Sequence, residues 1–141
     1  MRIALVLAAT LPFVFGVPPA AAQTAATTMP ADIDPQSGFR LPLPKREELD
    51  TLAGPTLLEF GSPWCGWCRR AQPLIAEALG QHPAVRHIKI ADASGKRLGR
   101  SFGVKLWPTL VFLRDGKEAT RLVRPDEEAE IAQALAAIDP R

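Results

Sequence analysis

The strongest constraint on this chain comes from five residues, Trp64-Cys65-Gly66-Trp67-Cys68, which contain both cysteines of the 141-residue sequence. Two thiols separated by two residues can close a disulfide within one turn of a helix. So small a ring adds only about 2 kcal/mol of stability in the chain-entropy model. Because such a bond contributes little as a cross-link, the spacing indicates a pair that exchanges electrons reversibly with other thiols.

Composition limits the classes of protein that remain. The chain has the length of one domain, and 47% of its residues are hydrophobic, enough for a core. Its formal net charge of +2, from 17 basic and 15 acidic residues, is too small to favour nucleic acid or an anionic membrane surface. Two cysteines allow one internal disulfide and exclude a larger disulfide framework.

The N-terminus is typical of a secretory signal peptide. Arg2 supplies positive charge, an apolar run spans 3–17, and Ala20-Ala21-Ala22 precede Gln23. The alternative is a transmembrane anchor, but a run of about 15 residues is shorter than the ~20 that a bilayer requires, and it contains a proline. A glutamine at the predicted cut argues against a lipoprotein anchor. We therefore expect export to a compartment outside the cytosol, the periplasm, where disulfides persist.

The remaining chain divides into a flexible linker and one folded domain. Residues 23–43 are rich in Ala, Thr, Pro and Gly and show no sustained period. With a signal peptide at 1–22 and this linker, the domain spans 44–141.

Hydrophobic periodicity predicts four helices and four strands in that domain. The helices are expected at 45–53, 65–79, 94–102 with Ser94 as its cap, and from Pro125 onward; the strands are expected at 56–60, 85–90, 109–113 and 118–123. A strand–helix–strand unit implies parallel pairing, whereas the turn signal Asp115-Gly116 implies an antiparallel hairpin. The order αβαβαββα thus predicts an α/β fold in which helices flank a mixed central sheet.

The position of Cys65 assigns it as the nucleophile. It opens a predicted helix, where unpaired backbone N–H groups and the helix dipole favour the thiolate. It would attack a substrate disulfide and form a mixed disulfide. Cys68, one turn deeper, would then attack Cys65 and release the reduced substrate.

These features together resemble the thioredoxin family over about 45–138. The cysteine motif follows a buried strand, Pro73 lies five residues past Cys68, Trp107-Pro108-Thr109 opens a strand, and Asp115-Gly116 forms a hairpin. A lone Cys-x-x-Cys also occurs in metal sites, but this combination is specific. The resemblance implies a thioredoxin fold whose redox-active disulfide, Cys65–Cys68, serves without a further cofactor or metal.

The resemblance also implies a substrate site. Pro108 corresponds to the family's cis-proline, and the backbone before it would pair with substrate as an added strand. Pro73 corresponds to the proline that kinks the family's active-site helix. Three indoles are expected to form a rim around the thiol, with Trp64 packed against the helix and the other two in contact with substrate. The candidate substrate-binding residues are Trp64, Gly66, Trp67, Trp107, Pro108 and Thr109.

Glu59 lies inside the apolar strand at 56–60 and has two interpretations. It is either a structural acid or, by resemblance to the family's buried Asp, a third catalytic residue that accepts a proton from Cys68. Glu is one methylene longer than Asp, so the geometry stays open. His82 and His87 are expected to be surface or strand residues, and Arg69 and Arg70 a solvated helix face.

The leading hypothesis is an exported thiol–disulfide oxidoreductase that acts on protein thiols and disulfides as a monomer. Within that class we favour a reductase, which by family analogy would draw electrons from a membrane-bound thiol donor. Two alternatives stay open: a Cu(I)-binding metallochaperone with Cys65 and Cys68 as soft ligands, and a binding module with a static disulfide. The identity of the substrate stays open.

Overall fold

The computed structural model of the protein describes residues 38–39, 43–92 and 96–140. The predicted signal peptide, most of the predicted linker and Ser94 lie outside the described residues. The described part contains eight elements in the predicted order αβαβαββα. In chain order they are α1 (Arg46–Asp50), β1 (Pro55–Gly61), α2 (Gly66–Gly80), β2 (Arg86–Ala91), α3 (Lys96–Ser101), β3 (Thr109–Arg114), β4 (Lys117–Val123) and α4 (Glu128–Ile138).

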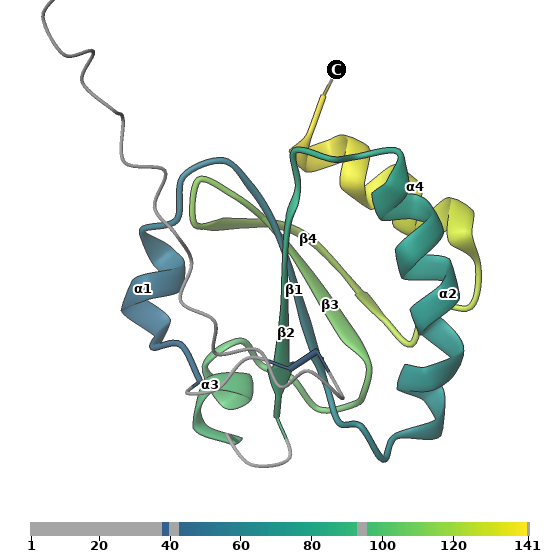
Figure 1. The fold of residues 1–141 in the computed structure, drawn as a ribbon. Coiled ribbons are helices and arrows are strands. Elements are labelled where there is room, and N and C mark those ends of the chain that lie inside the picture. Colours follow the sequence, from purple (N-terminus) through teal and green to yellow (C-terminus); the bar gives the residue numbers. More distant parts are fainter. Residues whose placement is uncertain (1–37, 40–42, 93–95, 141) are drawn as a thin grey trace, which may run out of the picture. The chain divides into compact units, whose positions relative to one another are not determined.

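The four strands form one mixed sheet in the order β2-β1-β3-β4. β1 pairs in parallel with β2 and antiparallel with β3, and β3 pairs antiparallel with β4. Figure 1 shows α2 and α4 against one face of the sheet and α1 and α3 against the other. The predicted α/β fold with a mixed sheet between helices is therefore confirmed.

β1 lies in the middle of the sheet and is buried on both faces. Side chains alternate along a strand, so Leu57 and Glu59 face α2 and α4, whereas Leu58 and Phe60 face α1 and α3. Two apolar clusters result, one on each side of the sheet. Glu59 thus places a carboxyl group in the layer that α2 covers.

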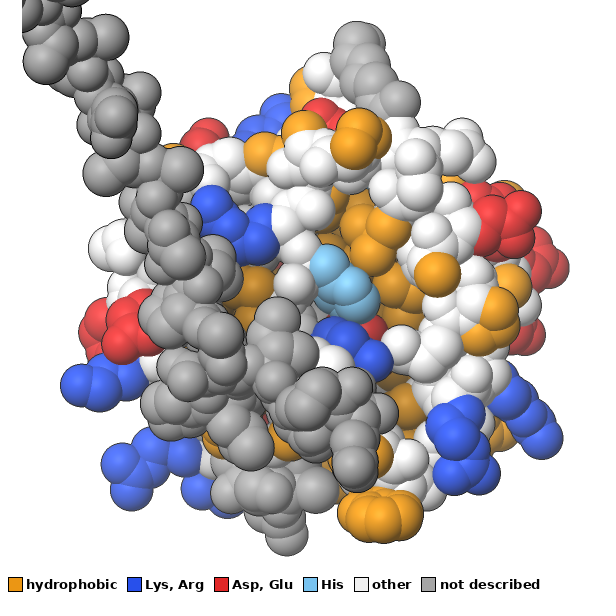
Figure 2. Space-filling model, viewed as in Figure 1, with side chains coloured by type: hydrophobic (Ala, Val, Ile, Leu, Met, Phe, Trp, Pro, Cys, Tyr) orange, Lys and Arg blue, Asp and Glu red, His pale blue; other side chains and the backbone are white. Residues whose placement is uncertain are grey.

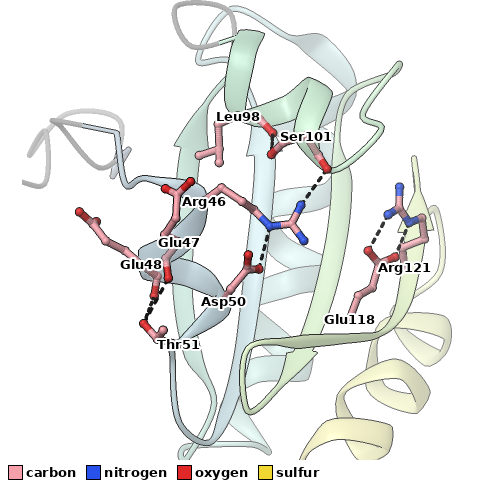
Figure 3. A network of polar contacts seen from close by, with 9 residues as sticks. All are labelled: Arg46, Glu47, Glu48, Asp50, Thr51, Leu98, Ser101, Glu118 and Arg121. Carbon is pink, nitrogen blue, oxygen red and sulfur yellow. Dashed lines mark hydrogen bonds and ion pairs between the residues drawn. The ribbon is translucent and has the colours of Figure 1, made fainter.

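Polar contacts join α1 to α3 on the opposite face (Figure 3). Arg46 Nε donates to Asp50 Oδ1 at 2.7 Å, and Arg46 Nη1 donates to the Ser101 carbonyl at 2.7 Å. The same guanidinium lies 4.0 Å from the ring centroid of Phe102, which packs against Phe60. Exposed ion pairs contribute little stability, so the apolar packing under this network holds the two helices on the sheet.

The hairpin is built as predicted, whereas α4 begins later than predicted. Asp115 and Gly116 both have positive φ, 51° and 73°, as a two-residue hairpin turn requires. The sequence predicts a helix opening at Pro125, but α4 begins at Glu128. Arg124, with φ of 54°, donates its N–H to the Pro108 carbonyl at 2.8 Å. Because this bond holds the end of β4 against the loop before β3, the helix starts only after the chain has left that loop.

Within the described residues, no helix is both long and apolar enough to span a bilayer. On the face seen in Figure 2, Lys and Arg side chains are scattered among apolar and uncharged ones rather than gathered in one patch. This distribution matches the small net charge of the sequence.

Candidate active site

Cys65 caps the N-terminus of α2 and does not form its first turn. Its backbone is extended, with φ −79° and ψ 116°, and its Sγ accepts the N–H of Cys68 at 3.2 Å. The side chain is half-buried, and both thiols are free. A backbone donor and the positive end of a helix dipole both stabilise negative charge on a capping atom. The geometry therefore suits Cys65 to attack a disulfide.

Cys68 differs from Cys65 because it is buried, with 3% of its surface exposed. Burial, reinforced by the hydrogen bond with Cys65 and by the negative charge of Glu59, raises the pKa of Cys68 to about 12. A hydrogen bond with the Ser62 backbone acts in the opposite direction. Because the thiolate and not the thiol is the nucleophile, a group that accepts the proton would favour attack by Cys68.

A hollow of about 320 Å³ lies beside Cys68. Gly61 leaves room for the thiol, because a Cβ at this position would lie 3.0 Å from Cys68 Sγ. Phe39 also borders the hollow and is 5% exposed, although it falls within the range predicted to be linker. The residues that line the hollow are Phe39, Glu59, Ser62, Pro63, Cys68, Arg69, Gln72 and Lys89.

Glu59 is completely buried and its carboxyl group has two hydrogen-bond partners. Gln72 Nε2 donates to its Oε1 at 2.6 Å, and His87 Nε2 lies 2.9 Å from its Oε2. Lys89 Nζ donates to Gln72 Oε1 at 2.8 Å, which fixes the orientation of the Gln72 amide. A carboxyl group with these partners shares the hollow with Cys68, so the predicted acid lies where it could exchange a proton with the thiol.

Sequence reasoning missed both hydrogen-bond partners of Glu59. Gln72 lies four residues after Cys68 on α2, so helical spacing places it on the same face. His87 and Lys89 share one face of β2, which the parallel register with β1 brings beside Glu59. The alternation of apolar and polar residues in β2 indicates that His87 and Lys89 share a face. Only the register between β1 and β2 shows that this face lies beside Glu59.

The three tryptophan side chains differ in exposure and in the residues that they contact. Trp64 is 86% exposed, so the expectation that it packs against the helix is wrong: the turn from β1 to α2 carries it outward. Trp67 is 46% exposed, and the guanidinium groups of Arg70 and Arg124 lie 5.1 and 5.3 Å from its ring centroid. Trp107 is half-buried, and its Nε1 donates to Asp92 Oδ2 at 2.9 Å. Trp64 and Trp67 therefore offer the most open apolar surface near Cys65.

Trp107–Pro108 is a cis peptide bond, as predicted. Arg124 Nε donates to the Trp107 carbonyl at 3.1 Å. Thr109 is 1% exposed and its hydroxyl donates to the Leu106 carbonyl at 2.7 Å, so its side chain faces the interior. Of the predicted substrate-binding residues, Thr109 could meet a substrate only through its backbone.

Gly66 is the first residue of α2, and a Cβ there would meet no atom within 4 Å. The surface next to Cys65 is thus open. Among the residues that the structure describes, no group of three or more His, Cys, Asp or Glu side chains is placed to hold a metal ion.

Comparison with known proteins gives a consistent result. The family model for thioredoxin matches residues 46–137. Thioredoxin 2 from Pseudomonas aeruginosa, solved in its reduced form, is 54% identical, with a TM-score of 0.66; the match covers 71% of this chain and 93% of that one.

Curated relatives match over shorter stretches. Thioredoxin H-type 1 from Nicotiana tabacum is 33% identical over 79 residues, which are 56% of this chain and 62% of the tobacco protein. Thioredoxin 1 from a Nostoc species is 27% identical over 92 residues, 64% of this chain and 85% of its own. The chain thus spans less than two thirds of the tobacco relative.

The difference in burial between the two thiols predicts selective alkylation. Iodoacetamide at about pH 8 should modify Cys65 in the folded, reduced chain and leave Cys68 as a thiol, because Cys68 loses its proton only near its pKa of about 12. Tandem mass spectrometry of the peptide that contains both cysteines locates the label. Labelling of Cys68 should increase as the pH is raised toward that value.

Chain unfolded in urea is the control, and both thiols should react there. Equal labelling of the two cysteines in the folded chain at pH 8 would contradict the geometry.

Proposed function

Because this chain belongs to the thioredoxin family, we propose that it is a thiol–disulfide oxidoreductase that exchanges disulfides with protein substrates through Cys65 and Cys68. The observation that carries the proposal is the inequality of the two thiols. Cys65 is partly exposed and its Sγ accepts a backbone N–H, whereas Cys68 is buried, which raises the pKa of its thiol. Such a pair separates the attack on substrate from the release of substrate.

The proposed reaction has two steps. In the first, the Cys65 thiolate attacks one sulfur of a substrate disulfide, and the other sulfur leaves as a thiolate that takes a proton from solvent. In the second, Cys68 loses its proton and attacks Cys65 Sγ. The Cys65–substrate bond breaks, the second substrate thiolate leaves, and the chain is left with the Cys65–Cys68 disulfide. The substrate gains two electrons and the chain loses two.

Glu59 is the proposed base for the second step. It shares the hollow with Cys68 and is the one carboxyl group among the residues that line it. A proton would move from Cys68 Sγ to the carboxylate, directly or through water in the hollow. Glu59 is a longer side chain than Asp, and its two hydrogen bonds define where the carboxylate sits.

Substrate would approach the exposed side of Cys65. Trp64 and Trp67 give apolar surface there, and large exposed aromatic side chains are typical anchors for a protein partner. The backbone before Pro108 is the proposed pairing strand. The Trp107 side chain, bonded to Asp92, would fix that segment.

The proposed direction is reduction of substrate, and the proposed place is outside the cytosol. The layout of the described domain, without an inserted helical domain between its elements, supports a reductase. The signal-peptide pattern of residues 1–22 supports export, to the periplasm. By analogy with the family, a reductase there would draw its electrons from a membrane-bound thiol donor.

Serine variants separate the two cysteine roles. Cys65→Ser should abolish turnover because it removes the attacking thiolate. Cys68→Ser should leave the first attack intact and accumulate mixed disulfides, which non-reducing electrophoresis of the chain with a disulfide-containing protein substrate detects. The double variant is the control for non-specific cross-links, and full activity of Cys65→Ser would overturn the assignment.

The equilibrium potential of the Cys65–Cys68 pair tests the direction of electron flow. A reductase should equilibrate with glutathione buffers at a potential below about −200 mV, the range of thioredoxin and the glutaredoxins. A value near −120 mV, which marks a strong oxidant, would reverse the proposed direction.

Fusion to alkaline phosphatase, which is active only where its disulfides form, tests export. Residues 1–43 in front of the reporter should give activity in bacterial cells, whereas the matched fusion of residues 23–43 should not. N-terminal sequencing of the exported full chain should begin at Gln23. Activity from both fusions, or from neither, would contradict the signal peptide.

A further inference from the structure

His87 is the one titratable side chain in hydrogen-bond contact with the buried acid, among the contacts of the described residues. Its Nε2 lies 2.9 Å from Glu59 Oε2. Glu59 is completely buried, whereas the His87 side chain is 24% exposed. The pair therefore connects a carboxyl group shielded from water to a ring that water reaches.

The other hydrogen bond of Glu59 does not carry a proton away. Gln72 Nε2 is an amide donor and cannot accept a proton from the acid, and its oxygen already accepts Lys89 Nζ. Histidine is different, because its Nε2 can donate to a carboxylate or accept from a carboxylic acid. Only the His87 side of the carboxyl group can therefore adapt when Glu59 gains a proton.

The charges around the pair come from several elements. Lys89 lies on the same strand as His87, and α2 contributes Arg69 and Cys68 along the hollow. On the other side of Glu59, β3 places Leu110 in register. α4 packs on this layer through apolar residues, and the segment before α1 contributes Phe39. Of these groups, histidine is the one whose ordinary titration falls between pH 5 and 8.

The sign of the effect follows from where the negative charge moves. Transfer of a proton from Cys68 to Glu59 takes negative charge away from the carboxylate and places it on the sulfur. An imidazolium in contact with the carboxylate opposes that movement, because it interacts more strongly with the nearer charge. A neutral imidazole does not oppose it.

We propose that His87 is a positioning residue that governs the resolving step through Glu59: the attack of Cys68 on Cys65 is slow while His87 is protonated and becomes fast once His87 is neutral. This inference rests on the proposed function, since it concerns the second step of that reaction. It assigns to His87 a pH-dependent control that the first step lacks.

The two steps can be timed with one reagent, dithiobis(nitrobenzoate). Cys65 attacks it and releases one yellow thiolate; Cys68 then attacks the mixed disulfide and releases a second. We expect the second release by the reduced full chain to accelerate about tenfold between about pH 5.5 and 8, with one inflection in that range. In His87→Gln that inflection should be absent from the second release, while the first release keeps the pH profile of the wild-type chain.

His82 provides a matched control. It forms the same kind of pair, with Nδ1 2.9 Å from Asp139 Oδ2, and it takes no part in the hollow. His82→Gln should keep the inflection of the second release. In Glu59→Gln the second release should be slow and should lack the inflection, because the group through which His87 acts is gone.

The outcomes separate the inference from the function on which it rests. If the wild-type chain releases only one thiolate, the proposed two-step function fails. If it releases two and His87→Gln keeps the inflection, or Glu59→Gln does, the inference about His87 fails. Should His87→Gln not fold, an NMR titration of the wild-type His87 ring decides: its midpoint must match that of the second release, and a mismatch overturns the inference.

Discussion

The burial of the Cys68 thiol between α2 and the sheet is the constraint on which the rest of the site depends. Removal from water raises the pKa of Cys68 to about 12 and so disfavours its thiolate. The proposed base, Glu59, lies in the same layer, and a carboxyl group buried there needs hydrogen-bond partners of its own. Gln72 on α2 and His87 on β2 are those partners. The proposed role of one buried sulfur thus connects polar side chains on three elements.

Much of the fold could be predicted because its signals are local. The apolar run of β1, the alternation of β2 and the turn residues Asp115-Gly116 each act within a few positions of the chain. The start of α4 could not be predicted in this way. Its start is displaced by the hydrogen bond between the Arg124 N–H and the carbonyl of Pro108, which lies far from Arg124 in the sequence. The burial of Phe39 could not be predicted for a related reason. A single aromatic residue in a segment without periodicity gives no indication of the residues that it packs against.

The site shows the same division between local and distant contacts. The cysteine spacing, the cis bond before Pro108 and the buried acid follow from motifs that can be read along the chain, together with a family resemblance. The contact between Glu59 and His87 depends on the register between two strands that α2 separates in sequence. The exposure of Trp64 depends on the direction in which one turn leaves the sheet. Contacts of this kind are fixed by tertiary geometry.

The order of the strands leaves β2 and β4 at the two margins of the sheet. Unpaired N–H and C=O groups on a marginal strand can recruit a strand from another molecule and begin aggregation. Both strands carry charged side chains that oppose such recruitment. They are Arg86 and Lys89 on β2, and Lys117, Glu118 and Arg121 on β4. The histidine beside the buried acid therefore lies on a strand whose neighbouring arginine and lysine discourage pairing with a foreign strand.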